Sequence, residues 1–159
     1  MNVAEIKNSD ELKDLYRELI LDHSRNPRHF GKLGDATHVA DGINPLCGDK
    51  LRLYLRLDGD DTVADAAFEG TGCAISVASA SLLTEMVIGK SRSDALLLFQ
   101  AIIDRLTEST AAVSADVDIG KIRALDGVRE FPARVKCATL AWHALNSAFK
   151  NHTSPASTE

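Results

Sequence analysis

The sequence predicts an α+β fold in which a small antiparallel sheet of about three strands packs against segregated helices. Two hydrophobic periods indicate this class. Leucines occupy every second position over residues 51–57, which is the period of a strand with one buried face. From residue 74 onward, apolar residues recur at the three-to-four-residue spacing of a helix. Strands followed by a run of helices are typical of α+β proteins.

The sheet is expected to contain a hairpin. Gly59-Asp60-Asp61 is a turn signal that directly follows the alternating leucines. Residues 62–68 then give a second strand, with weak alternation because Val63 and Ala67 are apolar on its polar side. Residues 38–43 are expected to add a third strand.

Helices are expected both before and after these strands in the sequence. A first helix begins with Ser9 as N-cap and ends before Asn26, because the residue ahead of a proline avoids helical backbone angles. The other expected segments are a helix from Ala74 that ends at Gly89, a helix from Ser91 or Ser93 to Leu106, a loop over 109–120, a short helix over 119–125, and a final helix with Pro132 in its first turn.

The length of 159 residues predicts a single domain. An apolar fraction of 45% and a charged fraction of 26% are ordinary for a globular chain that buries a core without disulfide staples. We expect the domain to cover residues 1–150. The polar segment 151–159 is expected to be a disordered tail.

Charge and hydropathy argue against two classes of partner. The net charge is −5 and no block of Lys or Arg is present, so a nucleic-acid partner is not expected. The longest apolar stretch, residues 95–99, is far shorter than a membrane span. Residues 1–10 contain no apolar run, so we expect no secretory signal and a cytoplasmic location, where cysteines stay reduced.

Three cysteines are the candidate functional residues. Cys47 lies in a turn before the alternating strand, Cys73 lies between a strand and a helix, and Cys137 lies near the start of the last helix. Their odd number and wide spacing argue against a disulfide framework. Asp49 follows Cys47 by two residues, so on an extended segment both side chains point the same way. Three thiolates and one carboxylate would complete a tetrahedral zinc site.

Other interpretations stay open on these residues alone. Free cysteines are often buried apolar fillers, so a binding or structural module with ordinary core cysteines is one alternative. Thiols at helix N-termini, as expected for Cys73 and Cys137, have a lowered pKa, which favours thiolate chemistry with or without a metal. The histidines are expected to be structural or surface residues and not ligands: His23, His29, His38 and His143.

Four segments together resemble the signatures of the NifU/IscU-like family of iron–sulfur cluster assembly proteins. They are Leu21–Arg28, Asn44–Asp49, Phe68–Ser76 and Arg134–Trp142. The resemblance extends from about Leu15 to Ala148, nearly the whole expected domain.

Within this family the chain is most similar to the SufU-type branch. Lys136 stands where the scaffold (IscU) branch carries a histidine before the last cysteine, and a protonated lysine cannot ligate zinc. The Leu-Pro-Pro-Val-Lys chaperone-recognition segment of the scaffold branch is missing. An additional helical pattern near 93–106 is also similar to SufU-type proteins.

The resemblance implies a SufE/NifU-like fold, a ligand set and a partner. Cys47, Asp49, Cys73 and Cys137 would bind Zn²⁺, and no other cofactor is implied. The partner would be a SufS-type cysteine desulfurase, a pyridoxal-phosphate enzyme that Arg134 would engage. Cys47 would be the catalytic sulfur acceptor, released from zinc when a histidine of the partner replaces it. Downstream scaffold proteins of the SUF system are implied as further partners.

The implied function is a zinc-dependent sulfurtransferase that accepts persulfide sulfur for iron–sulfur cluster assembly. The alternative is an IscU-like scaffold, on which a [2Fe–2S] cluster is assembled on the same residues and passed to apo-proteins.

Overall fold

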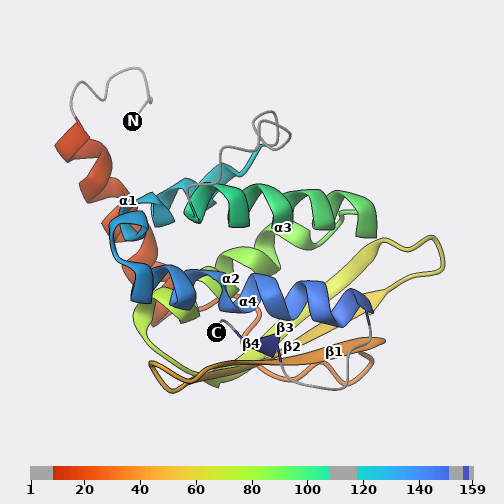
Figure 1. Cartoon of the computed structure of the whole chain (residues 1–159). Coiled ribbons are helices and arrows are strands. Elements are labelled where there is room, and N and C mark those ends of the chain that lie inside the picture. Colours follow the sequence, from red (N-terminus) through yellow and green to blue (C-terminus); the bar gives the residue numbers. More distant parts are fainter. Residues whose placement is uncertain (1–8, 108–117, 151–155, 158–159) are drawn as a thin grey trace.

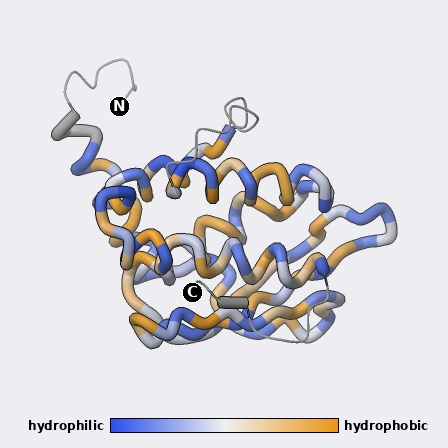
Figure 2. The backbone as a smooth tube through the Cα atoms, in the orientation of Figure 1, coloured by the Kyte–Doolittle hydropathy of each residue, from blue (hydrophilic) through white to orange (hydrophobic). Residues whose placement is uncertain are grey.

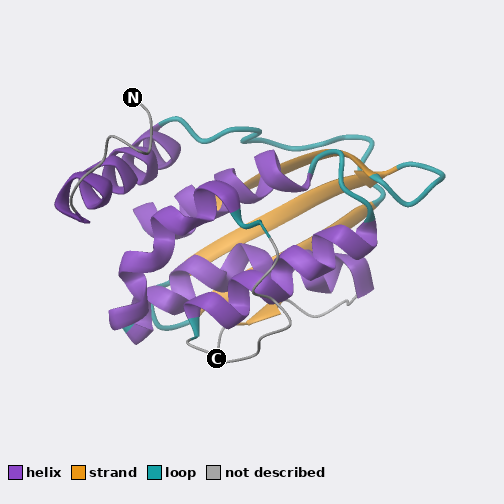
Figure 3. Cartoon of the chain, turned by 90° about the horizontal axis from the view of Figure 1, so that it is seen from above, coloured by secondary structure: helices purple, strands orange, loops and turns teal. Residues whose placement is uncertain are grey.

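The computed structural model describes residues 9–107, 118–150 and 156–157 of the chain. In it, a sheet forms one layer and the helices lie on one of its faces (Figure 1, Figure 3). The elements in chain order are α1 (Ser9–Arg25), β1 (His38–Asn44), β2 (Asp49–Leu57), β3 (Val63–Thr71), α2 (Ala74–Val87), α3 (Arg92–Leu106), the 3₁₀ helix η3 (Gly120–Glu130), α4 (Pro132–Lys150) and β4 (Ala156–Ser157). The predicted α+β class is confirmed.

The sheet has the strand order β3-β2-β1-β4. Its three long strands are antiparallel neighbours, as the sequence predicts, and Asn44 at the end of β1 pairs with Asp49 at the start of β2. The short β4 adds a parallel edge pairing to β1 that the sequence does not predict. Of the expected tail, residues 151–155 and 158–159 lie outside the described part of the chain.

The alternating leucines of β2 form the floor of the core. Leu51, Leu53 and Leu55 are buried beneath the helices, whereas Lys50 and Arg52 point to the opposite, exposed face. Figure 2 shows hydrophobic and hydrophilic stretches interspersed along both the strands and the helices. Burial of one such leucine contributes about 1.5–3 kcal/mol to folding, so the strand's register is strongly determined.

Two helices lie directly on the sheet. α2 packs on β3, and α4 packs on β1 and β2, while α3 and η3 pack on α4 and on each other in a second layer (Figure 1). Trp142 of α4 is fully buried, and its indole N–H donates to Ser79 Oγ of α2 at 3.1 Å. Since α2 and α4 are fixed both to the sheet and to each other, residues at their N-terminal ends are held against the strand ends.

The helix boundaries follow the predicted signals closely. α1 ends at Arg25, directly before the Asn-Pro pair, and α4 begins at Pro132. Ser91 is the N-cap of α3, since its hydroxyl accepts a hydrogen bond from Asp94 N–H at 3.1 Å. The short helix expected over 119–125 is the longer η3, and residues 109–117 of the expected loop lie outside the described part. No helix in the described segments is both long and apolar enough to cross a membrane.

Candidate metal centre

The three cysteines and Asp49 come from separate parts of the chain. Cys47 lies in the turn between β1 and β2, and Asp49 is the first residue of β2. Cys73 is the N-cap of α2, with the extended backbone angles of a cap residue. Cys137 lies in the second turn of α4. Because α2 and α4 pack side by side over the sheet, their first turns meet the β1–β2 turn.

The side chains of these residues converge. The sulfurs of Cys137 and Cys47 are 3.6 Å apart. The ligand atoms of Cys47, Asp49 and Cys137 all lie within 4.8 Å of one another. Cys73 lies outside this group of three and adjoins it through Asp49, since its sulfur is 4.0 Å from Asp49 Oδ2. The structure thus brings three predicted site residues into one cluster, with the fourth at its side.

This donor set fits zinc. Zinc–sulfur bonds of about 2.3 Å and zinc–oxygen bonds of about 2.0 Å in a tetrahedron place neighbouring ligand atoms about 3.5–3.8 Å apart. The Cys137–Cys47 separation of 3.6 Å and the Cys73–Asp49 separation of 4.0 Å are close to that spacing. Soft thiolates together with one carboxylate are ligands that zinc accepts, and thiolates also suit iron–sulfur clusters.

The four residues differ in their access to solvent. Cys47 is exposed, Cys73 is half-buried and Cys137 is buried. Asp49 is only 2% exposed. An exposed thiol does not fill a core, so Cys47 contradicts the interpretation of these cysteines as ordinary apolar fillers. The cluster therefore has a buried side, made by Asp49 and Cys137, and an open side at Cys47.

Asp49 is held by the backbone at the start of α2. The Cys73 N–H donates to Asp49 Oδ1 at 3.0 Å. This close approach requires glycine at position 72, where a Cβ would lie 3.0 Å from Asp49 Oδ1 and 2.3 Å from Ser76 Oγ. Gly72, beside Cys73, is therefore needed here to admit the carboxylate.

The pKa of the Cys137 thiol differs from the lowered value that the sequence predicts. Burial raises the pKa of Cys137 far above its usual range, and the neighbouring side chains of Cys73, Asp49 and Cys47 raise it further. The prediction of a lowered pKa at Cys137 is wrong because the residue lies a turn inside α4, behind other groups and away from the free N–H groups of the helix end. A cation at this position would offset the cost of a buried thiolate.

Arg134 and Lys136 lie on the first turns of α4, beside the cluster. Arg134 is exposed, and Lys136 lies in a hollow with Arg129 and His143. Among the described residues, neither Arg134 nor Lys136 forms an ion pair. Both side chains belong to the helix that carries Cys137.

The four histidines in the described part of the chain lie outside the cluster. His23 is buried, with Nδ1 2.7 Å from Ser81 Oγ, and His29 Nδ1 is 3.0 Å from Thr84 Oγ1. His38 contacts the hydroxyl of Thr37 at 2.9 Å, and His143 packs edge-on against Phe99.

One residue of the site is missed by sequence reasoning. Asn44 is fully buried, and its side-chain N–H₂ lies 3.5 Å from Asp49 Oδ2 and 3.6 Å from Cys137 Sγ. The sequence offers one signal that could have identified Asn44: it is the first residue of the Asn44–Asp49 motif.

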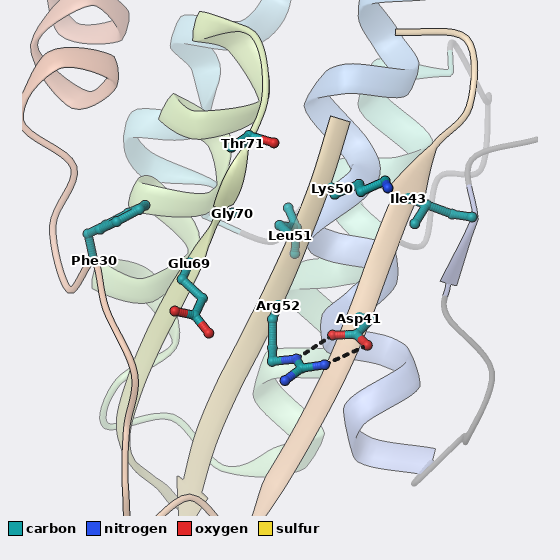
Figure 4. A pocket seen from close by; sticks show the side chains of 9 residues that line it. All are labelled: Phe30, Asp41, Ile43, Lys50, Leu51, Arg52, Glu69, Gly70 and Thr71. Carbon is teal, nitrogen blue, oxygen red and sulfur yellow. Dashed lines mark hydrogen bonds and ion pairs between the residues drawn. The ribbon is translucent and has the colours of Figure 1, made fainter. Parts of the chain in front are cut away.

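The helix-free face of the sheet carries a second hollow, shown in Figure 4. Phe30, Ile43, Lys50 and Glu69 are among its lining residues, and Arg52 spans it in an ion pair with Asp41 at 2.6 Å. Its lining includes no cysteine or histidine, so it is separate from the thiol cluster.

The fold and the cluster define a class of small α+β domains in which a strand turn and the N-terminal ends of two helices bring thiols and a carboxylate together at a candidate metal site. Comparison with known proteins narrows this class. Residues 15–156 match the family described as the NifU-like N terminal domain. The chain is 49% identical over 134 residues to the zinc-dependent sulfurtransferase SufU of Bacillus subtilis, covering 84% of this chain and 88% of that protein.

Two further similarities agree with this match. The chain is 42% identical over 142 residues to the iron–sulfur cluster assembly scaffold protein IscU of Streptococcus pyogenes, covering 88% of this chain and 86% of that protein. The crystal structure of the N-terminal part of a nitrogen-fixing NifU-like protein from Brucella abortus superposes with a TM-score of 0.73 at 25% identity, covering 87% of this chain and 94% of that one. The chain belongs to the NifU/IscU-like family, as a SufU-type member.

Proposed function

We propose that this chain is a zinc-dependent sulfurtransferase that accepts persulfide sulfur from a SufS-type cysteine desulfurase for iron–sulfur cluster assembly. The observation that carries the proposal is the pairing of an exposed thiol, Cys47, with a buried one, Cys137, 3.6 Å away and beside Asp49. The similarity to the Bacillus subtilis protein, which is named a zinc-dependent sulfurtransferase, supports it.

In this proposal Cys47, Asp49, Cys73 and Cys137 hold Zn²⁺. The metal keeps the thiolates deprotonated and ties the β1–β2 turn to α2 and α4, so its loss destabilises the fold. Cys137 and Asp49 anchor the buried side of the site. Cys47, on the exposed turn, would be the ligand within reach of a partner, and a histidine of the partner would take its place on the zinc.

The transfer step is a thiol–disulfide exchange. The Cys47 thiolate attacks the outer sulfur of the desulfurase persulfide, and a new S–S bond forms at Cys47 as the partner's S–S bond breaks. The partner cysteine leaves as a thiolate and takes up a proton. One S–S bond is exchanged for another, so no external oxidant or reductant is required. Arg134 contacts the desulfurase in this proposal. The proposal also includes the cytoplasmic location expected from the sequence. Downstream scaffold proteins of the SUF system are its further partners.

A [2Fe–2S] scaffold is the second candidate, favoured by the 42% identity to an IscU scaffold protein and by the cysteine content of the cluster. The two functions differ in the metal group that the protein holds, which is zinc in a sulfurtransferase and an iron–sulfur cluster in a scaffold. A sulfurtransferase keeps its zinc during anaerobic incubation with iron and sulfide, whereas a scaffold gains a coloured cluster that it transfers to an apo-acceptor.

The test is sulfur transfer with purified desulfurase and cysteine, followed by mass spectrometry of the chain. We expect a mass gain of one sulfur at Cys47 in the wild type and none in Cys47→Ser. Arg134→Ala is expected to weaken stimulation of the desulfurase, with Arg123→Ala as control because Arg123 is likewise exposed but lies on η3. Absence of sulfur at Cys47, or equal effects of both arginine variants, would contradict the proposal.

A further inference from the structure

Asn44 occupies an unusual position for a neutral amide. It is the last residue of β1, is 0% exposed, and pairs across the strand with Asp49. Its backbone carbonyl accepts hydrogen bonds from the N–H groups of Cys47 at 3.2 Å and Gly48 at 2.9 Å, which closes the turn. Its backbone thus shapes the turn that carries Cys47, while its side chain points inward.

The side-chain amide of Asn44 serves two ligands at once. Its nitrogen lies 3.5 Å from Asp49 Oδ2 and 3.6 Å from Cys137 Sγ. The second distance is ordinary for a donor to the large sulfur atom, and the first is a long hydrogen bond. The Cys73 N–H holds the other carboxylate oxygen at 3.0 Å, so both oxygens of Asp49 are engaged.

The carbonyl oxygen of the same amide has no partner. Asn44 Oδ1 is buried without a hydrogen bond among the described residues. An unpaired buried acceptor destabilises a fold, and an apolar side chain of similar volume would avoid it. Since this amide is unfavourable for packing, its N–H₂ group is the feature that the site uses.

We propose that Asn44 is a positioning residue that holds Asp49 and Cys137 as a fixed pair of ligands and leaves Cys47 as the releasable one. An N–H···S contact withdraws charge from a thiolate and makes it a weaker nucleophile. Cys137 receives this contact, whereas the Cys47 sulfur has no amide donor among the described residues. The inference rests on the proposed function and explains why Cys47, and not Cys137, takes the sulfur.

Two substitutions remove the donor in different ways. Asn44→Leu has similar volume and no polar group, and Asn44→Asp keeps the shape but has only acceptors. Ser81→Ala is the matched control, because Ser81 is buried in α2, accepts from the Arg28 N–H at 2.8 Å and contacts His23 at 2.7 Å, two turns beyond Cys73.

The first measurement is zinc affinity by competition with a chromophoric chelator. Loss of an outer-shell contact typically weakens metal binding about 10–100-fold, and we expect that loss in both Asn44 variants and none in Ser81→Ala. The second is the absorption spectrum of the cobalt-substituted proteins. Without the N–H···S contact, the sulfur-to-cobalt charge-transfer band should move to longer wavelength in both Asn44 variants, and not in the control.

The outcomes separate the two proposals. Wild-type affinity and an unchanged cobalt band in a folded Asn44 variant, with only a lower melting temperature, would refute the positioning role. If Asn44→Leu does not fold, Asn44→Asp decides by the same measurements. A wild type that binds zinc but accepts no sulfur would refute the proposed transfer reaction while the zinc measurements still decide the role of Asn44.

Discussion

Replacement of Asp49 separates its structural role from its role toward the metal. In Asp49→Ala, the Cys73 N–H loses its 3.0 Å acceptor and Asn44 loses its 3.5 Å contact, both in a nearly dry site. A hydrogen bond to a charged group is worth about 1.5–3 kcal/mol, so we expect the metal-free protein to lose about 2–4 kcal/mol. For a chain of this size, that corresponds to a melting temperature lower by about 5–15 °C.

Asp49→Asn provides the control. The amide oxygen still accepts from the Cys73 N–H, so the metal-free protein should lose less than half of that stability. Zinc affinity should nevertheless fall in both variants, by more than the roughly 10–100-fold that an outer-shell contact is worth, because a neutral amide is a poor substitute for a carboxylate ligand. The assays are thermal denaturation in chelator and competitive zinc titration. An Asp49→Asn protein that binds zinc within about threefold of wild type would refute the assignment of Asp49 as a ligand.

Three further predictions follow from the same geometry. Cys47→Ser should abolish sulfur uptake, read by mass spectrometry, while the exposed position leaves the melting temperature of the metal-free protein unchanged. Gly72→Ala should lower both thermal stability and zinc affinity, because its Cβ would lie 2.3 Å from Ser76 Oγ; Gly34→Ala, where a Cβ meets nothing within 4 Å, is the control. Burial lowers the pKa of His23 and His143 below 6.5, so the unfolded chain binds more protons and the free energy of unfolding should fall as pH drops below about 6.5. The free energy of unfolding, measured by denaturant titration at several pH values, should depend less on pH in His143→Phe than in the wild type. An unchanged pH dependence would contradict the role given to the buried His143.

The sequence determines most of the fold because local and tertiary signals agree. The alternating leucines of β2 bury one face as a strand period requires, and Pro132 and Ser91 begin helices as their backbone preferences dictate. The two-residue β4 is missed because so short a strand has no period to detect.

The candidate site is predicted less completely. Motifs single out Cys47, Asp49, Cys73 and Cys137, yet the contact of Cys47 with Cys137 depends on how α4 packs over the sheet, which no local pattern specifies. The contact of Asn44 with Cys137 joins residues 93 positions apart, so the amide's role is invisible in the sequence. The pKa of Cys137 differs from its prediction for the same reason, because residues distant in sequence bury the thiol and that burial raises its pKa.

In the proposed function, Cys47, Asp49, Cys73 and Cys137 bind one zinc ion together. X-ray absorption at the zinc edge of the purified protein can test this coordination, because it counts the sulfur and oxygen neighbours of the zinc by distance. We expect three sulfurs at about 2.3 Å and one oxygen at about 2.0 Å, with one sulfur fewer in Cys73→Ala. Zinc with two or fewer sulfur neighbours in the wild type, or an unchanged spectrum in Cys73→Ala, would contradict it.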